Sequence, residues 1–169
     1  MPLIIKNRSV IEDTWTLLGA DASLEEALQN EKAIVPFSLW QAERETLLKK
    51  MHRAVWLESN EIIEDLADDL DQLELVALNF PAFTDGRHFS SARLLRERYK
   101  FAGEVRAIGD VLRDQLFYMQ RCGFDAYAIR SDKDPFDALK GLSDFSISYQ
   151  AAVDNDQPLF RRRAAAQTP

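Results

Sequence analysis

A strand, a loop, a helix and a second strand follow one another in residues 75–109, LVALNFPAFTDGRHFSSARLLRERYKFAGEVRAIG. Residues 75–80 are almost wholly apolar, which is typical of a parallel strand buried on both faces. A helix is predicted over residues 88–101, with Gly103 placed to end it, and the next strand over residues 104–109. Two strands joined by a helix predict a parallel pair with a crossover connection.

The same alternation continues on both sides of this unit. Further strands are predicted at residues 32–37, 53–59, 126–130 and 145–152, and further helices at residues 38–50, 61–73, 111–122 and 135–142. Six strands in series exceed a single strand–helix–strand unit but fall short of the eight that a closed barrel needs. The predicted fold class is therefore α/β, with alternating strand–helix units forming a mostly parallel open or partial-barrel sheet.

The N-terminal part has a different pattern. Residues 3–6 and 14–18 read as two short strands, which predicts a small β-hairpin ahead of the alternating units. Nothing between the predicted elements resembles a linker, so we expect one α/β domain over residues 1–155. Residues 156–169 are polar and are predicted to form a flexible tail.

The composition is that of an ordinary globular protein. Of the 169 residues, 46% are hydrophobic and 29% charged, and no apolar run approaches the length of a membrane span. The sequence begins without a secretory leader pattern, so the cytoplasm is the expected compartment. The single cysteine and the two separated histidines provide no metal-ligand spacing, and no dinucleotide fingerprint is present. We therefore expect no cofactor and no metal.

Negative charge is concentrated in one segment. Residues 60–74 contain seven acids and no base, while the rest of the chain balances 21 acids against 21 bases. Nucleic acid is an unsuitable ligand for such a surface, because duplex binding requires cations that neutralise phosphates. Two interpretations stay open, a solvated outer face of a helix and a docking surface for a basic partner.

A site is expected where the parallel strands end, because ligands bind beyond the carboxyl ends of such strands. The loop after residues 75–80 is the richest in polar groups. There Gly86 would supply a positive φ, Arg87 would clamp an oxyanion at a helix N-terminus, and Asp85 and Ser90 would add polar contacts. In the alternative interpretation Asp85 is only a helix cap, Gly86 only a turn and Arg87 only a surface cation.

Other candidates on this edge carry weaker signals. His88 is better placed for proton transfer than His52, although a solvent-facing structural role is favoured for it. Asp110 is most simply the cap of the helix predicted from residue 111, and an acid–base pair with Asp85 is the second interpretation. Cys122 is predicted to be inert core, because no neighbouring base is identifiable.

Two motifs resemble one bacterial family. They are Phe83-Thr84-Asp85-Gly86-Arg87-His88-Phe89-Ser90 and the run GEVRAIGDV at residues 103–111, followed by Asp114-Gln115-Leu116. The chain is similar here to a domain of unknown function labelled "oxidoreductase probably involved in sulfite reduction". The resemblance implies a place beside the sulfite reductase haemoprotein in sulfate assimilation. It adds Arg106 and Asp110 to the candidate ligand-binding residues and assigns no catalytic residue.

These observations lead to three functional hypotheses. The favoured one is an accessory protein of assimilatory sulfite reduction, which docks on a redox partner such as the sulfite reductase haemoprotein and binds a small oxyanion at the edge formed by Asp85, Gly86 and Arg87. The alternative is a free-standing enzyme acting on an anionic metabolite at the same edge. The third is an α/β scaffold without activity. A homodimer is compatible with each of them.

Overall fold

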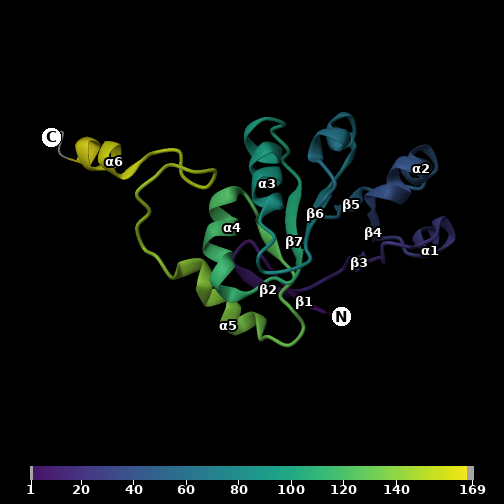
Figure 1. Cartoon of the computed structure of the whole chain (residues 1–169), viewed down its shortest axis with the longest axis horizontal. Helices are drawn as coiled ribbons and strands as arrows, with labels where there is room; N and C mark the ends of the chain where they lie inside the picture. The colour runs from purple at the N-terminus through teal and green to yellow at the C-terminus, as the bar shows by residue number, and fades with distance from the viewer. Residues whose placement is uncertain (1, 167–169) are drawn as a thin grey trace.

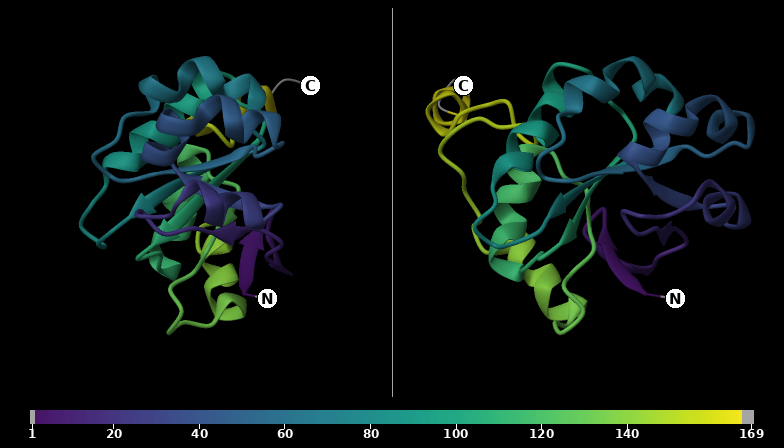
Figure 2. Two further views of the ribbon diagram at one scale, coloured as in Figure 1. Left: turned by 90° about the vertical axis from the view of Figure 1, so that its right-hand side faces the viewer. Right: turned by 45° about the vertical axis from the view of Figure 1, so that its right-hand side comes forward.

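An eight-stranded sheet, curled into a half-barrel, organises the chain. The structure is a computed structural model and describes residues 2–166. Its strand order is β2-β1-β8-β7-β6-β5-β4-β3. In Figure 2 the helices lie around the outside of the curl, and the N-terminal strands stand at one end of it. The predicted fold class, a mostly parallel partial-barrel sheet with an N-terminal antiparallel pair, is confirmed.

The elements alternate as the apolar pattern predicts. The strands are β1 (Leu3–Lys6), β2 (Ser9–Glu12), β3 (Thr16–Leu17), β4 (Ala33–Pro36), β5 (Ala54–Leu57), β6 (Leu75–Phe80), β7 (Glu104–Gly109) and β8 (Ala126–Tyr127). The α-helices are α1 (Leu24–Gln29), α2 (Phe37–Lys49), α3 (Arg87–Glu97), α4 (Leu116–Cys122), α5 (Pro135–Leu139) and α6 (Leu159–Ala166). The described residues also form three 3₁₀ helices: η1 (Ile63–Gln72), η2 (Arg113–Gln115) and η3 (Lys140–Ser143). Figure 1 follows this order by colour along the chain.

Strands β3 to β8 run parallel, and β1 closes on β8 in the antiparallel sense. Strand β6 is the centre of the sheet, paired along its whole length with β7 from Leu75↔Glu104 to Phe80↔Gly109. Apolar side chains fill both of its faces. Val76 and Leu78 pack under the helices, while Leu75 and Ala77 belong to a second cluster on the inner face of the curl. Burial on both faces explains why this strand lacks a polar alternation.

The N-terminal hairpin differs from the prediction in its second strand. Residues 3–6 pair with β2 rather than with residues 14–18. The two-residue turn at Asn7 and Arg8 has positive φ at both positions, 49° and 63°, which is the twist that a tight hairpin requires. Thr16 and Leu17 instead pair in parallel with β4, at the opposite edge of the sheet.

Several predicted helices and strands have different bounds or types. Residues 63–72 form a 3₁₀ helix, and α3 ends at Glu97, with Lys100 rather than Gly103 in the left-handed conformation. No strand forms over the described residues 145–152, although their alternating pattern predicts one. Part of the predicted tail is helix α6, which buries no residue and stands away from the body in Figure 1. The last three residues of that tail lie outside the described part.

Candidate functional site

Three loops meet at the carboxyl edge of the sheet, as the parallel arrangement of the strands predicts. Asp110, which follows β7, joins them through its two carboxylate oxygens. Oδ2 accepts from the backbone N–H of Phe83 at 3.0 Å, and Oδ1 accepts from Nη1 of Arg130 at 2.8 Å. Asp110 is therefore not the helix cap that the sequence suggested, since the next helix begins only at Arg113. Its carboxylate holds the loops after β6 and β8 in one place.

Gly109 lets β6 and β7 end close together. Its φ is +92°, which side chains rarely adopt. A Cβ atom at this position would lie 2.4 Å from both Oδ1 of Asn79 and the carbonyl oxygen of Phe80. The strand therefore requires glycine at its last residue, and this requirement fixes the position of the Asp110 backbone that follows.

Asp85 and Arg87 form an ion pair at the surface of this edge. Nε and Nη2 of Arg87 donate to the two carboxylate oxygens of Asp85 at 3.0 and 2.6 Å, and Nη2 also donates to Oγ of Ser59 at 2.8 Å. The Arg87 guanidinium holds the pKa of the Asp85 carboxyl well below its usual range. The Arg87 guanidinium, which was expected to bind an anion from solution, is thus already bound to the nearby carboxylate of Asp85.

The backbone at Gly86 is ordinary. Its φ is −103°, so the expected positive φ is wrong. Asp85 accepts a hydrogen bond from the backbone N–H of Arg87 at 3.2 Å. The N-cap of α3 is nevertheless Gly86, so Asp85 is not the helix cap that the alternative interpretation proposed. The turn at this position depends on the Asp85 side chain rather than on a left-handed glycine.

A set of hydrogen-bonded polar residues that the sequence analysis did not select lies next to the carboxyl edge of the sheet. Asn79 donates from Nδ2 to Oε2 of Glu58 at 2.8 Å, and Glu61 Oε2 accepts from the backbone N–H of Glu58 at 2.7 Å. Burial raises the pKa of the Glu61 carboxyl, and the hydrogen bond to Glu58 opposes this rise. The signal that could have identified this layer is Asn79, the one polar side chain in an otherwise apolar strand.

His88 is buried beneath the same edge, so the expectation of a solvent-facing side chain is wrong. Its Nε2 lies 2.9 Å from the carbonyl oxygen of Glu58, and its Nδ1 lies 3.1 Å from Oγ of Ser91. Burial lowers the pKa of the imidazole, which keeps the ring neutral, with Nε2 donating and Nδ1 accepting. The ring joins β5 to α3 and has no access to a ligand in solution.

Two candidates lie away from this edge. Arg106 is 2% exposed and projects from the middle of β7, where Asp13 and Glu104 accept from its guanidinium at 2.8 and 2.6 Å. Lys6 adds a second cation to Glu104 at 2.6 Å. This buried network attaches the N-terminal strands to the sheet. Ser90 is exposed on α3 and borders a cleft on the helical side of the molecule.

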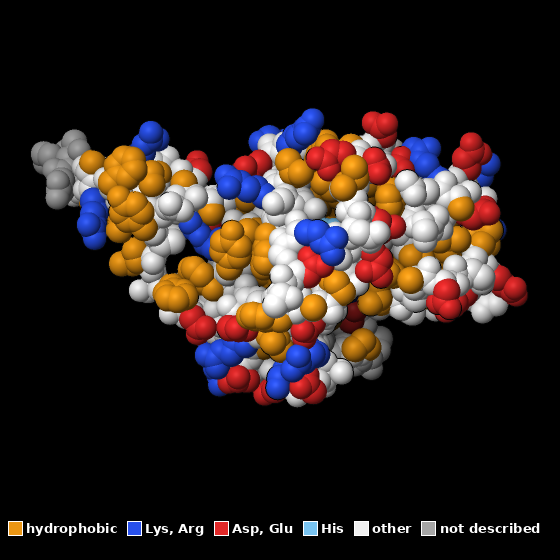
Figure 3. Space-filling view, in the orientation of Figure 1, with side chains coloured by type: hydrophobic (Ala, Val, Ile, Leu, Met, Phe, Trp, Pro, Cys, Tyr) orange, Lys and Arg blue, Asp and Glu red, His pale blue; other side chains and the backbone are white. Residues whose placement is uncertain are grey.

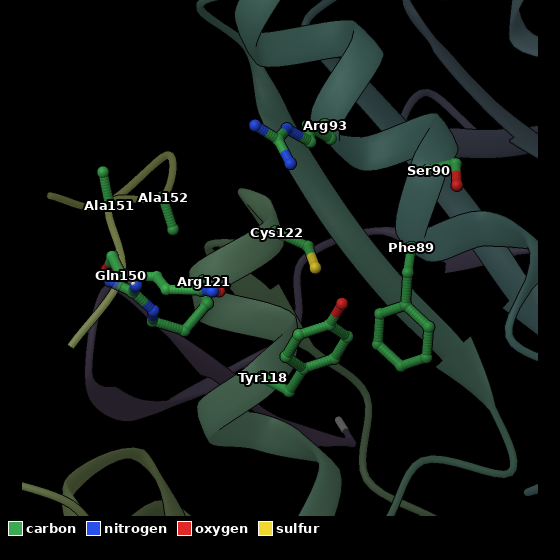
Figure 4. A pocket seen from close by; sticks show the side chains of 9 residues that line it. All are labelled: Phe89, Ser90, Arg93, Tyr118, Arg121, Cys122, Gln150, Ala151 and Ala152. Atoms are coloured by element: carbon green, nitrogen blue, oxygen red, sulfur yellow. Dashed lines mark hydrogen bonds between the residues drawn. The ribbon is translucent and has the colours of Figure 1, made fainter. Parts of the chain in front are cut away.

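That cleft lies between α3 and α4, beneath residues 150–152 (Figure 4). Its volume is about 270 Å³, and its walls include Phe89, Arg93, Tyr118 and Cys122. Cys122 is mostly buried, as predicted for a core residue, and burial raises the pKa of its thiol. Figure 4 shows its sulfur directed into the cleft, so the thiol forms part of a wall rather than of the apolar core alone.

Five exposed acids project from η1 and from the residue before β6, and we call them the acidic face. They are Glu64, Asp65, Asp68, Asp71 and Glu74. No side-chain hydrogen bond or ion pair joins them to any described residue. Figure 3 shows acidic side chains beside apolar ones along the upper margin of the molecule.

Asp69, from the same segment, faces inward and has a structural role. It accepts from Nε1 of Trp40 at 2.7 Å and pairs with Arg44. Burial acts to raise the pKa of Asp69, but the hydrogen bonds from Arg44 and Trp40 outweigh this effect and lower the pKa. Asp69 therefore holds η1 against α2 and leaves the five other acids facing solvent.

Neither a metal centre nor a membrane span is identified. Within residues 2–166, no group of three or more His, Cys, Asp and Glu side chains is arranged to hold a metal ion. None of the helices described has both the length and the apolar character needed to cross a bilayer.

Comparison with known proteins gives a family but no characterised relative. No curated protein and no solved structure matches the chain. A family described as "Bacterial protein of unknown function (DUF934)" matches residues 54–160, a span that begins at β5 and includes the carboxyl edge, the acidic face and the α3–α4 cleft. The match covers more than half of the sequence, so the chain belongs to this family of bacterial proteins, DUF934.

Proposed function

We propose that the protein is an accessory factor of assimilatory sulfite reduction, which docks on a redox partner through its acidic face. The observation that carries the proposal is the acidic face itself. Its five carboxylates form no ion pair with a described residue, although Arg44 lies within electrostatic range of Asp68. Most other charged side chains near the carboxyl edge are paired. A basic partner would supply the missing counter-charges.

Electrostatics favours such a partner over a solvated surface. Like charges one helical turn apart destabilise a helix by a few tenths of a kcal/mol per pair, and a basic surface would remove this repulsion. Ile62 is 54% exposed directly before η1 and offers an apolar contact beside the charges. Complementary charge accelerates encounter and makes binding depend on salt.

The link to sulfite reduction rests on the sequence resemblance, and the residue content supports an accessory role. Reduction of sulfite to sulfide requires six electrons and therefore haem or iron–sulfur centres. One cysteine cannot supply the four thiolates that hold an iron–sulfur cluster. The partner must therefore provide the redox centres.

The alternative, a free-standing enzyme at the carboxyl edge, receives less support. Arg87 is already bound to Asp85, and His88 is 1% exposed. An oxyanion at Arg87 would have to compete with a carboxylate held in the same loop. Binding of an oxyanion at Asp85, Gly86 and Arg87 stays a prediction, and catalysis there would need a proton-transfer group other than His88.

The test measures binding of the purified sulfite reductase haemoprotein to the isolated protein over a range of salt concentrations. The triple variant Asp65→Asn, Asp68→Asn, Asp71→Asn should weaken binding about tenfold, since exposed pairs contribute about 0.2–1 kcal/mol each. The matched control is Asp21→Asn, Glu25→Gln, Glu26→Gln, which changes the net charge equally on another exposed segment.

The control variant should bind like the wild type, and wild-type binding should weaken as salt is raised. Absence of binding at low salt, or equal binding by all three proteins, would contradict docking through this face. Consumption of sulfite by the isolated protein with an electron donor would instead favour the enzyme hypothesis.

A further inference from the structure

The cleft between α3 and α4 combines an arginine, a hydroxyl and an aromatic wall. None of its lining residues belongs to the carboxyl-edge ion pairs or to the acidic face, and neither the proposed docking nor the family description uses it. The backbone of residues 150–152 covers one side, held there by Arg121, which donates to the carbonyl oxygen of Gln150 and pairs with Asp154 at 2.6 Å. The cleft is therefore a formed space with a fixed cover.

Arg93 contributes an incompletely used guanidinium at the rim. Its Nε donates to Oε2 of Glu97 at 2.8 Å, while its two terminal nitrogens make no hydrogen bond to any described residue. The side chain is 62% exposed, and Figure 4 shows the guanidinium at the edge of the cleft. Arg87, by contrast, has Nε and one terminal nitrogen engaged by Asp85 and Ser59. Arg93 is thus the freer anchor for an anion.

The opposite wall supplies one donor and a flat apolar surface. The rings of Phe89 and Tyr118 lie 5.0 Å apart between centroids, and the Tyr118 hydroxyl lies beside the Cys122 thiol (Figure 4). Burial raises the pKa of the Cys122 thiol, so it is protonated at neutral pH. The pKa of the Tyr118 hydroxyl is also raised, because any thiolate formed beside it at higher pH opposes its ionisation, so it too is protonated at neutral pH. Neither group repels an anion.

We propose that this cleft binds a small organic anion, a carboxylate or sulfonate attached to a flat apolar body. The free nitrogens of Arg93 hold the oxyanion, and the Tyr118 hydroxyl adds a donor. The apolar body lies against the rings of Phe89 and Tyr118. A volume of about 270 Å³ suits a ligand of one ring rather than a nucleotide.

The single cysteine provides a direct reporter of occupancy. Alkylation of Cys122 by N-ethylmaleimide, followed by mass spectrometry of the intact chain, measures access to the cleft without interference from another thiol. Benzenesulfonate and benzoate are the probes, sulfate represents the head without the ring, and benzamide represents the ring without the charge. An anion at ten times its Kd should slow alkylation about tenfold.

The decisive variant is Arg93→Gln, and the matched control is Arg98→Gln, an exposed arginine near the end of the same helix that does not line the cleft. Because Arg93 also lowers the thiol pKa, each protein is compared with itself, with and without the probe. Benzenesulfonate and benzoate should protect Cys122 in the wild type and in Arg98→Gln but not in Arg93→Gln. Benzamide and sulfate should protect weakly in all three.

Two results would overturn the proposal: no protection by either aromatic anion, or equal protection in Arg93→Gln. Should the thiol react too slowly to follow, backbone amide shifts on titration with benzenesulfonate answer the same question. Residues 89–93 and 118–122 should shift in the wild type, and unshifted signals there would equally overturn the proposal. The experiment uses the isolated protein, so its result is independent of the proposed docking on a redox partner.

Discussion

The guanidinium of Arg87 and the carboxylate of Asp85 share two hydrogen bonds across two residues of one loop. We expect Arg87→Gln to raise the pKa of Asp85 toward about 3.9, because the variant removes the cation that stabilises the ionised form. A carboxyl-detected NMR titration of Asp85 in both proteins measures this change.

The same pair gives the direction of an acid effect on folding. A carboxyl whose pKa is depressed in the folded state stabilises it above the unfolded pKa, and this contribution is lost as the pH falls further. The gain is small because Arg87 is largely exposed and screened by solvent. An unchanged Asp85 pKa in Arg87→Gln would show that the loop does not hold the pair in solution.

Gly109 and Gly86 should respond differently to alanine. Gly109→Ala forces a side chain into a positive φ and against Asn79 and the Phe80 carbonyl, so we expect a loss of at least about 2 kcal/mol in unfolding free energy. At Gly86 the φ is negative and a Cβ would meet only the Phe89 ring at 3.4 Å. Gly86→Ala should therefore change stability by less than about 1 kcal/mol. Urea unfolding followed by circular dichroism compares the two, and similar losses at both sites would contradict this assignment.

The buried cation of Arg106 should be costly to remove. Arg106→Ala leaves Asp13 without its cation in the interior and Glu104 with Lys6 alone, and we expect a loss of about 3–5 kcal/mol. The double variant Arg106→Met, Asp13→Asn restores the side-chain volume and removes both charges. Its unfolding free energy should lie between those of Arg106→Ala and the wild type. Arg163→Ala, at an exposed arginine on α6, is the control and should change stability by less than about 0.5 kcal/mol. Equal stability of Arg106→Ala and the control would contradict the network.

We expect the unfolding free energy to decrease in mild acid because of the two histidines. Burial lowers the pKa of both His88 and His52 in the folded protein, while unfolded histidine titrates near about 6.5. The unfolded chain thus binds protons first, and stability falls as the pH drops from about 7.5 to 5.5, by at most about 1.4 kcal/mol per pH unit for each ring. His88→Gln should flatten the dependence without abolishing it, because His52 continues to contribute. Urea midpoints measured across this pH range test the prediction, and an unaltered slope in His88→Gln would contradict it.

The sequence predicts the sheet well because its central strands are buried on both faces. Continuous apolar runs such as Leu75–Phe80 identify strands without reference to their neighbours. The convergence of Asp85, Asp110 and residues 130–134 at one edge follows from parallel topology alone. The strand predicted at residues 145–152 is wrong because alternation describes a side-chain pattern, and the sheet offers this segment no partner there.

The candidate site was predicted less completely, because the availability of its charged side chains depends on which other side chains they pair with in the folded protein. Whether Arg87 is free or bound depends on the rotamer of Asp85, which no spacing reveals. Arg106 lies in the middle of β7, and its guanidinium is bound by Asp13, which is 93 residues away in the sequence. The Arg93–Tyr118 cleft joins two helices that lie side by side only in the folded chain.

The closure of β1 on β8 has a consequence for synthesis on the ribosome. Strand β1 is made more than a hundred residues before its partners Ala126 and Tyr127. Until then the hairpin of β1 and β2 has no partner in the sheet, and the edge of β7 that β8 will occupy is open. An open strand edge is a template for pairing with other chains. The half-barrel is therefore closed last at its N-terminal hairpin, through contacts of long sequence separation that form slowly.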